Sequence, residues 1–241
     1  NKYRDWLFEG ERDLEIQDAC FPDVLDGNWQ ATVADAKSIL DGYPGRIGIH
    51  GPFMGLTILG RDPKVRALTY GRLMQGLEFA AALDATHMVV HSPFEFFGTS
   101  FLPHSLSHGQ TEQIELIHQT VGPVVDQAAQ IGCTIVIEDI FDLHHAPVQA
   151  LVRSFKSDYV RRSIDTGHAY ITHLRGGPTP DQWVREDGAL LEHVHIQDTD
   201  GQLDRHWRPG VGNINWHAFF EALATLAQKP RLILELRNVD E

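Results

Sequence analysis

Short runs of β-branched and other apolar residues alternate with longer amphipathic runs along almost the whole chain. This alternation constrains the fold most. Seven runs predict strands, at residues 14–19, 46–50, 87–92, 134–139, 160–166, 191–197 and 231–237. Strands that alternate with helices form parallel βαβ units, and short Val- and Ile-rich strands are typical of a sheet covered on both faces. For a chain of 241 residues, this pattern predicts a TIM (β/α)₈-type barrel, with residues 1–241 as a single domain.

A closed barrel of this type needs one more strand than the seven that the pattern shows. Residues 1–13 are too polar to supply it, so we expect the first strand to lie upstream of this sequence or to be missing. A doubly wound open sheet is the alternative fold, but no predicted strand leads into a Gly-x-Gly-x-x-Gly turn. The helical spacing predicts helices at 29–41, 63–83, 111–131, 146–155, 181–190 and 216–228.

The overall charge and the apolar pattern restrict the partners. The formal net charge is -13, which argues against a nucleic-acid partner because such a partner needs a basic surface. We find no signal peptide and no apolar run long enough to cross a membrane, so we expect a cytoplasmic protein. The sequence leaves open whether the protein forms a homo-oligomer. Cys20 and Cys133 fit no metal or redox spacing and are expected to be buried thiols.

Titratable side chains recur at the carboxyl ends of the predicted strands. In a TIM-type barrel these ends meet on one face, where the catalytic residues lie. Each residue alone has an ordinary explanation, such as a hydrogen-bonded core imidazole or a carboxylate that caps the next helix. Their recurrence favours a functional site. The residues are His50, His91, Glu138, Asp165, His168, His195 and Glu235.

Four of these residues form the simplest candidate metal-binding set, namely Glu138, Asp165, His195 and Glu235. Three carboxylates and one imidazole suit a hard or borderline divalent ion. Burying so many negative charges together is unfavourable without a cation. We therefore expect one divalent metal ion as cofactor, which is Mn²⁺, Mg²⁺, Co²⁺ or Zn²⁺.

The strand-end residues also form a series of short motifs in a definite order. The series resembles the xylose isomerase-like barrel superfamily, and within it the sugar phosphate isomerase/epimerase group, which is related to endonuclease IV. It extends from residue 50 to residue 237, and no single motif in it is specific. The motifs are His50-Gly-Pro, His91-Ser-Pro, Ile137-Glu138-Asp139, Asp165-Thr-Gly-His168, His195-Ile-Gln-Asp198, Asp204-Arg-His206, Pro209-Gly-Val-Gly212 and Glu235-Leu-Arg237.

The resemblance implies a metal-dependent isomerase or epimerase that acts on a small-molecule sugar, sugar phosphate or polyol. Glu138 and Glu235 then hold the metal and also work as an acid/base pair, which moves a proton next to a carbonyl through an enediolate. The resemblance places His168 at the substrate oxygens, and Arg237 is a further substrate-binding candidate. Phe94 opens an aromatic loop, residues 94–109, that can wall a small pocket or simply pack onto the barrel.

Two other activities use similar residues. An endonuclease IV-like phosphodiesterase that cleaves abasic DNA binds up to three Zn²⁺, and here Asp204 and His206, together with His50, His91 and His168, are its additional ligand candidates. Its need for a basic groove conflicts with the acidic charge. A keto-polyol dehydratase would use the same metal site. The sequence does not decide among these activities, although it favours the isomerase/epimerase class.

Overall fold

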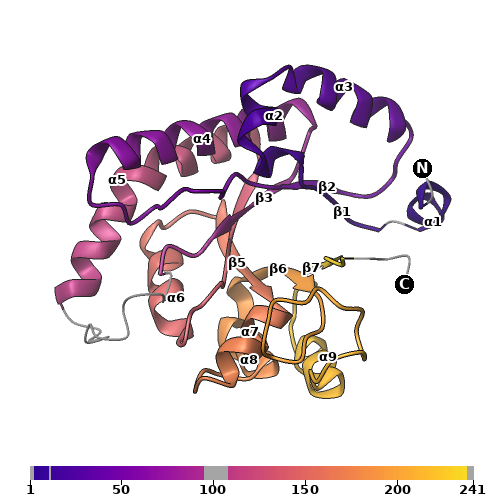
Figure 1. Cartoon of the computed structure of the whole chain (residues 1–241), viewed down its shortest axis with the longest axis vertical. Helices are drawn as coiled ribbons and strands as arrows, with labels where there is room; N and C mark the ends of the chain where they lie inside the picture. The colour runs from indigo at the N-terminus through magenta and orange to yellow at the C-terminus, as the bar shows by residue number, and fades with distance from the viewer. Residues whose placement is uncertain (1–2, 11, 95–107, 238–241) are drawn as a thin grey trace. The chain divides into compact units, whose positions relative to one another are not determined.

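A computed structural model describes residues 3–10, 12–94 and 108–237. Within these residues, seven strands form one sheet in the order β1-β2-β3-β4-β5-β6-β7 (Figure 1). All seven predicted strands are confirmed. Their bounds are β1 (Leu14–Ile16), β2 (Ile47–His50), β3 (His87–His91), β4 (Thr134–Glu138), β5 (Val160–Asp165), β6 (Leu191–Ile196) and β7 (Arg231–Leu234).

The order of the strands distinguishes between the two predicted folds. Each strand lies next to its neighbours in the sequence, and the pairs β1–β2, β2–β3, β5–β6 and β6–β7 are parallel. A doubly wound sheet has a point at which the strand order reverses, and this sheet has none among the described strands. The fold is therefore of the TIM-barrel type, as the sequence predicts.

Helices connect most of the strands. The six predicted helices are present, and α1, α2 and α7 were not predicted. Residues 1–13 were considered too polar for a strand, and α1 lies among them. The bounds are α1 (Arg4–Phe8), α2 (Pro22–Asp26), α3 (Trp29–Ile39), α4 (Pro63–Ala82), α5 (His108–Ile131), α6 (His145–Ser154), α7 (Thr166–His173), α8 (Pro180–Asp187) and α9 (Trp216–Ala224), with short 3₁₀ helices η1 (Asp18–Cys20) and η2 (Gly188–Leu190).

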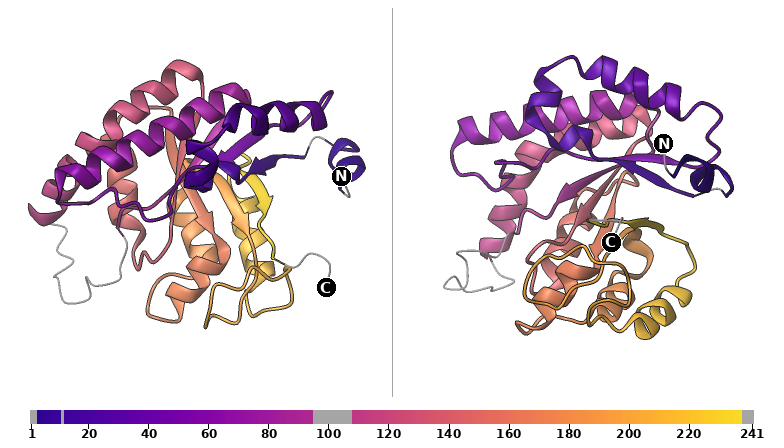
Figure 2. Two further views of the ribbon diagram at one scale, coloured as in Figure 1. Left: turned by 45° about the horizontal axis from the view of Figure 1, so that its top comes forward. Right: turned by 45° about the vertical axis from the view of Figure 1, so that its right-hand side comes forward.

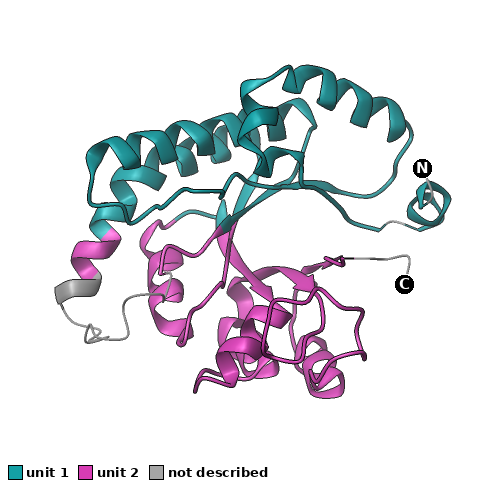
Figure 3. Cartoon of the chain, in the orientation of Figure 1, with its two compact units in different colours: residues 1–90, 115–135, 157–160 teal, residues 91–114, 136–156, 161–241 magenta. Residues whose placement is uncertain are grey.

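The chain divides into two compact units, shown in different colours in Figure 3. Unit 1 comprises residues 1–90, 115–135 and 157–160, and unit 2 comprises residues 91–114, 136–156 and 161–241. The single domain over residues 1–241 stays a prediction. In unit 1, α3 packs against α4 (Figure 2). The core of this unit includes Leu73, Leu77, Phe79, Met88 and Val124.

Unit 1 also buries a polar pair. The Nε2 of His87 lies 3.2 Å from the Oε2 of Glu15, and both side chains are buried. Gly48 on β2 leaves room for this imidazole, because a Cβ at Gly48 would lie 1.9 Å from the His87 ring. A larger residue at position 48 would therefore displace His87.

In unit 2, α8 packs against α6, α7 and α9. Trp183 on α8, Leu151 on α6, Phe219 on α9 and Val194 on β6 are fully buried there. This apolar layer covers one side of β5 and β6. The alternate side chains of the same two strands are left to form a polar cluster, because successive side chains of a strand point to opposite faces.

A proline and a glycine mark two helix boundaries in unit 1. Pro63 begins α4 and the Asp62 side chain caps it, and Gly132 ends α5 with a φ of 69°, which a glycine adopts without strain. Cys20 and Cys133 are buried. Among the described residues, none of the helices is long and apolar enough to span a membrane.

Candidate metal centre and active site

The four candidate metal ligands lie together in unit 2. Glu138 ends β4, Asp165 ends β5, His195 lies on β6, and Glu235 directly follows β7. One donor atom from each lies within 4.8 Å of the others. The register of the sheet explains part of this, because Asp165 pairs with His195 across β5 and β6. Their side chains are therefore neighbours on the same face.

His195 lies between the two glutamates. Its Nδ1 is 2.8 Å from the Oε1 of Glu138 and 3.2 Å from the Oε2 of Glu235. Glu138 and His195 are buried, whereas the Glu235 side chain is 19 % exposed. One glutamate is thus enclosed and the other reaches solvent.

The environment of Asp165 indicates that an additional positive charge would stabilise this cluster. Burial, together with the charges of Glu138 and Glu235, raises the pKa of Asp165 to about 6 against the opposing influence of His168. Its Oδ1 accepts hydrogen bonds from the backbone N of His168 and from Gln197, but its buried Oδ2 has no hydrogen-bond partner. A buried acceptor without a donor is costly. The donor set and this orphaned oxygen fit a divalent cation.

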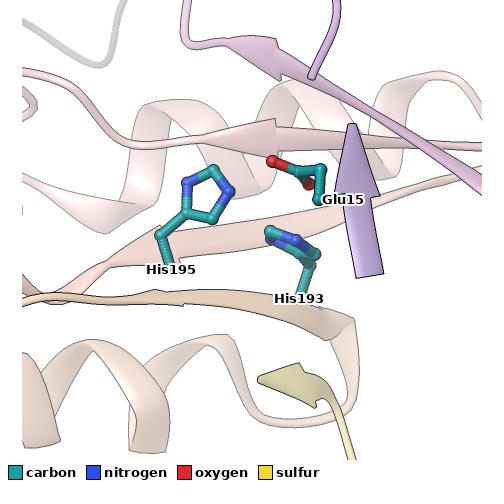
Figure 4. A group of neighbouring side chains, drawn as sticks. All are labelled: Glu15, His193 and His195. Carbon is teal, nitrogen blue, oxygen red and sulfur yellow. The ribbon is translucent and has the colours of Figure 1, made fainter. Parts of the chain in front are cut away.

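A second imidazole supports His195 from within the strand. His193 and His195 project from the same face of β6, as Figure 4 shows. Their rings meet edge to face, with centroids 4.7 Å apart, and the Nδ1 of His193 lies 2.8 Å from the Ser163 hydroxyl. The packing restricts the orientation of His195, which a ligand needs.

Two further predicted histidines border the cluster. His91, which ends β3, has its Nε2 3.8 Å from the Oε2 of Glu138. The Nδ1 of His168 donates to the backbone oxygen of Asp139 at 3.0 Å. Burial alone would lower the pKa of His168, but the carboxylates of Asp165, Asp204 and Glu138 outweigh it and raise the pKa well above its usual value. The acidic neighbours therefore favour the protonated form of His168.

Asp204 and His206 form a hydrogen-bonded pair beside the cluster. The Nε2 of His206 lies 2.8 Å from the Oδ2 of Asp204, and its Nδ1 donates to the backbone oxygen of Glu235 at 3.0 Å. Burial would raise the pKa of Asp204, but the neighbouring imidazoles of His206 and His168 hold it far below its usual range. The exposed Arg237 has its Nη2 3.7 Å from Asp204. Two imidazoles and a guanidinium group thus surround the Asp204 carboxylate.

The remaining predicted residues in the described part of the chain are His50 and Phe94. His50 belongs to unit 1, where it ends β2; its Nδ1 donates to the Gly51 backbone oxygen at 3.0 Å and its ring packs on Phe53. Phe94 is half-buried, and its backbone N donates to the Ser92 hydroxyl at 3.3 Å. Residues 95–107 of the aromatic loop lie outside the described residues. Their role as a pocket wall stays a prediction.

Residues that the sequence analysis named only as parts of motifs, without a role, hold this site in place. The buried Asp198 carboxylate accepts hydrogen bonds from the backbone N of Thr199, Gly210 and Ile214 and from the indole of Trp216. It therefore organises the loop after β6, and each of its two oxygens accepts two hydrogen bonds. No periodicity signals such a role, since its donors lie up to 18 residues away.

Asp139 has a similar supporting role. Its Oδ1 accepts the backbone N–H of Asp165 at 2.9 Å. Burial raises its pKa well above the usual range, although the nearby Arg162 opposes the shift. Gln197, which follows β6, contacts both Asp165 and Asp204.

The consecutive parallel strands and the cluster at their carboxyl ends define a TIM-type barrel with a candidate divalent-metal centre. Residues 16–241 match the family described as "xylose isomerase-like TIM barrel". The chain belongs to that family.

Several proteins are similar to this chain. A Methanocaldococcus jannaschii protein, MJ1311, is 25% identical over 206 residues, which cover 83% of this chain and 67% of that protein. A D-tagatose 3-epimerase-like protein has a similar structure, with a TM-score of 0.77 and 24% identity over 95% of this chain and 83% of that one. The Thermus thermophilus protein TTHB071, solved after soaking with ZnCl₂, has a TM-score of 0.66 and 25% identity over 95% and 93%. A D-psicose 3-epimerase, solved in the presence of D-fructose, has a TM-score of 0.71 and 18% identity over 98% and 80%.

Proposed function

We propose that this protein is a divalent-metal-dependent sugar isomerase or epimerase. The observation that carries the proposal is the pair of glutamates, Glu138 and Glu235, on either side of His195 in a cluster that also contains Asp165. Structural neighbours described as 3-epimerases of tagatose, psicose and ribulose support it. The substrate class that follows is a small ketose, its phosphate or a related polyol.

Four residues would hold the metal ion, namely Glu138, Asp165, His195 and Glu235. When bound, the ion would polarise the sugar carbonyl and so acidify the neighbouring C–H bond. One glutamate removes the proton from that carbon, and the other returns a proton. If they act on opposite faces, the carbon is inverted, which is epimerisation. The enclosed Glu138 would keep its proton from bulk water longer than the partly exposed Glu235.

The other side chains of unit 2 can orient the sugar. His168, whose protonated form is favoured by its acidic neighbours, would donate to a substrate oxygen. Asp204 is anionic and would accept from a hydroxyl group, and Arg237 is exposed beside it. Charged groups with opposite donor and acceptor character suit a ligand that carries many hydroxyls.

The test is proton exchange at the carbon next to the carbonyl. Chelator-treated protein is reloaded with Mn²⁺ and incubated in ²H₂O with D-fructose, D-tagatose, D-psicose and their phosphates, and NMR measures deuterium in the sugar. Glu138→Gln and Glu235→Gln should each lower turnover by about 100-fold or more, because general acid–base catalysis contributes about that much. Glu186→Gln, a half-exposed glutamate of the same unit, is the matched control. Exchange at the unchanged rate in both site variants would overturn the acid/base roles.

One observation favours a second candidate, a phosphodiesterase with up to three Zn²⁺ ions. Asp204 lies 2.8 Å from the Nε2 of His206 and 3.7 Å from the Nε2 of His168, so a second set of ligand types borders the first. Close to three zinc ions per chain and nicking of abasic duplex DNA would support it. His206→Ala should then release a metal ion, whereas one metal per chain, unchanged in this variant, supports the sugar enzyme.

A further inference from the structure

Gln197 connects the candidate metal cluster to the Asp204–His206 pair. It directly follows β6, is fully buried, and is neither a candidate ligand nor part of the acid/base pair. Its side-chain Nε2 donates to the Oδ1 of Asp165 at 3.1 Å and to the Oδ1 of Asp204 at 2.6 Å. Its Oε1 accepts the backbone N–H of His206 at 3.0 Å.

This arrangement needs an amide group. A glutamine side chain offers two N–H donors and one carbonyl acceptor, and these contacts use both donors and the acceptor. A flipped amide would turn its oxygen toward two carboxylates, so the contacts fix its orientation. The NH₂ group separates two acidic groups that would otherwise repel each other.

The surrounding residues hold Gln197 in place. The Thr166 hydroxyl donates to the Gln197 backbone oxygen at 2.7 Å and accepts its backbone N–H at 3.0 Å. Gly167 leaves the space that the side chain fills, because a Cβ there would lie 2.3 Å from the Gln197 Cδ. The Asp165-Thr-Gly-His168 motif therefore needs glycine at its third position so that the Gln197 side chain can pack there.

The other end of the connection is a strained turn. His206 has a φ of 52°, which is uncommon for a residue other than glycine. Gln197 fixes its backbone N, and Arg237 donates a backbone N–H to its carbonyl oxygen at 3.0 Å. Strained backbone of this kind persists only where several contacts hold it.

We propose that Gln197 is a positioning residue of the metal centre. Its amide orients Asp165 so that the free Oδ2 oxygen is presented to the ion, and it fixes the Asp204–His206 turn at a set distance from that ion. This inference rests on the proposed function, because it assumes that the cluster binds a divalent metal. Residues that orient a ligand typically change metal affinity by about 10- to 100-fold when they are replaced.

The experiment measures Mn²⁺ affinity by titration and the melting temperature of the same samples. Gln197→Met keeps the size of the side chain but removes all three contacts, and Gly167→Ala displaces the amide without removing it. Gln149→Met is the matched control. Gln149 is a second buried glutamine of unit 2, and its Nε2 donates to the Glu186 backbone oxygen and to Asp187.

We expect Gln197→Met and Gly167→Ala to raise the Mn²⁺ dissociation constant by about 10-fold or more. Gln149→Met should lower the melting temperature and leave the dissociation constant unchanged. If Gln197→Met lowers the melting temperature but binds Mn²⁺ as tightly as the unmodified protein, Gln197 only stabilises the fold and the inference is wrong. If the unmodified protein binds no divalent ion, the proposed function fails first and the inference fails with it.

Discussion

Carboxyl groups within unit 2 differ widely in acidity. Burial raises the pKa of Asp142 to about 6, whereas two imidazoles lower that of Asp204 far below its usual range. Asp142 accepts hydrogen bonds from the Ser92 hydroxyl at 2.8 Å and from the backbone N of Ile140 at 3.1 Å. These two donors are not enough to offset its removal from water.

Asp142 therefore predicts a pH dependence of stability. The folded pKa of about 6 lies above the ordinary value of 3.8, so the folded protein binds the extra proton between these values. Stability contributed by this group is present below pH 4 and is lost as the pH rises through 6. Asp142→Asn should remove that loss. The free energy of unfolding of the variant should then rise by up to about 3 kcal/mol relative to the unmodified protein between pH 4 and 7. Urea unfolding at several pH values measures the difference, and a constant difference would contradict it.

Sequence analysis succeeds for some site residues and fails for others for a clear reason. Glu138, Asp165, His195 and Glu235 lie at strand ends, where the alternation of the chain already shows which residues meet. Gln197 has the same position but no titratable group, and its role depends on Gly167 and on a turn seven to nine residues later. That the four strand-end residues bind a metal stays a prediction.

At the scale of elements, the loop between β6 and α9 depends on one carboxylate. Asp198 accepts four hydrogen bonds from this loop and from the first residue of α9. Hydrogen bonds to a charged acceptor are each worth about 1.5 to 3 kcal/mol. The loop carries Asp204 and His206, so its shape determines whether that pair meets the cluster.

Asp198→Asn should loosen this loop. An amide NH₂ group would face at least one N–H donor, so we expect a loss of about 2 to 3 kcal/mol in the free energy of unfolding and faster hydrogen exchange over residues 199–215. Asp200→Asn is the control. Asp200 is partly exposed, pairs with Arg205 and accepts the backbone N–H of Gln202, so its replacement should cost less than about 1 kcal/mol. Equal effects of the two variants would show that Asp198 has no special role.

Element prediction fails where an element has no boundary signal of its own. Each predicted strand is a compact run of apolar residues, and each is present. Helix α7 escapes prediction because it begins with Thr-Gly and follows the strand without a loop. Its start depends on Asp165, whose side chain caps the helix by accepting the His168 N–H. The same carboxylate is a candidate metal ligand, so one residue serves two purposes that a local pattern does not reveal.

At the scale of the whole molecule, metal binding should increase the stability of the folded state. A ligand that binds only the folded state, present at 100 times its dissociation constant, adds about 2.7 kcal/mol to the free energy of unfolding. For a protein of this size, each kcal/mol raises the melting temperature by about 2 to 4 °C. We expect Mn²⁺ to raise the melting temperature of chelator-treated protein, and Asp165→Asn to abolish that increase. Asp181→Asn, which affects only a helix-surface pair with Arg185, should retain it. No Mn²⁺-dependent shift in the unmodified protein would argue against a metal centre.

The consecutive order of the strands also sets the sequence in which the site can form. Each strand pairs with the one before it in the chain, so the sheet can grow by adding one βα unit at a time as the ribosome releases it. The four candidate ligands come from β4, β5, β6 and the residue after β7. They become neighbours only when β7 docks against β6. If the cluster binds an ion as proposed, a nascent chain would complete the ligand set late, after most of the sheet is built, and a chain stalled before β7 would lack Glu235.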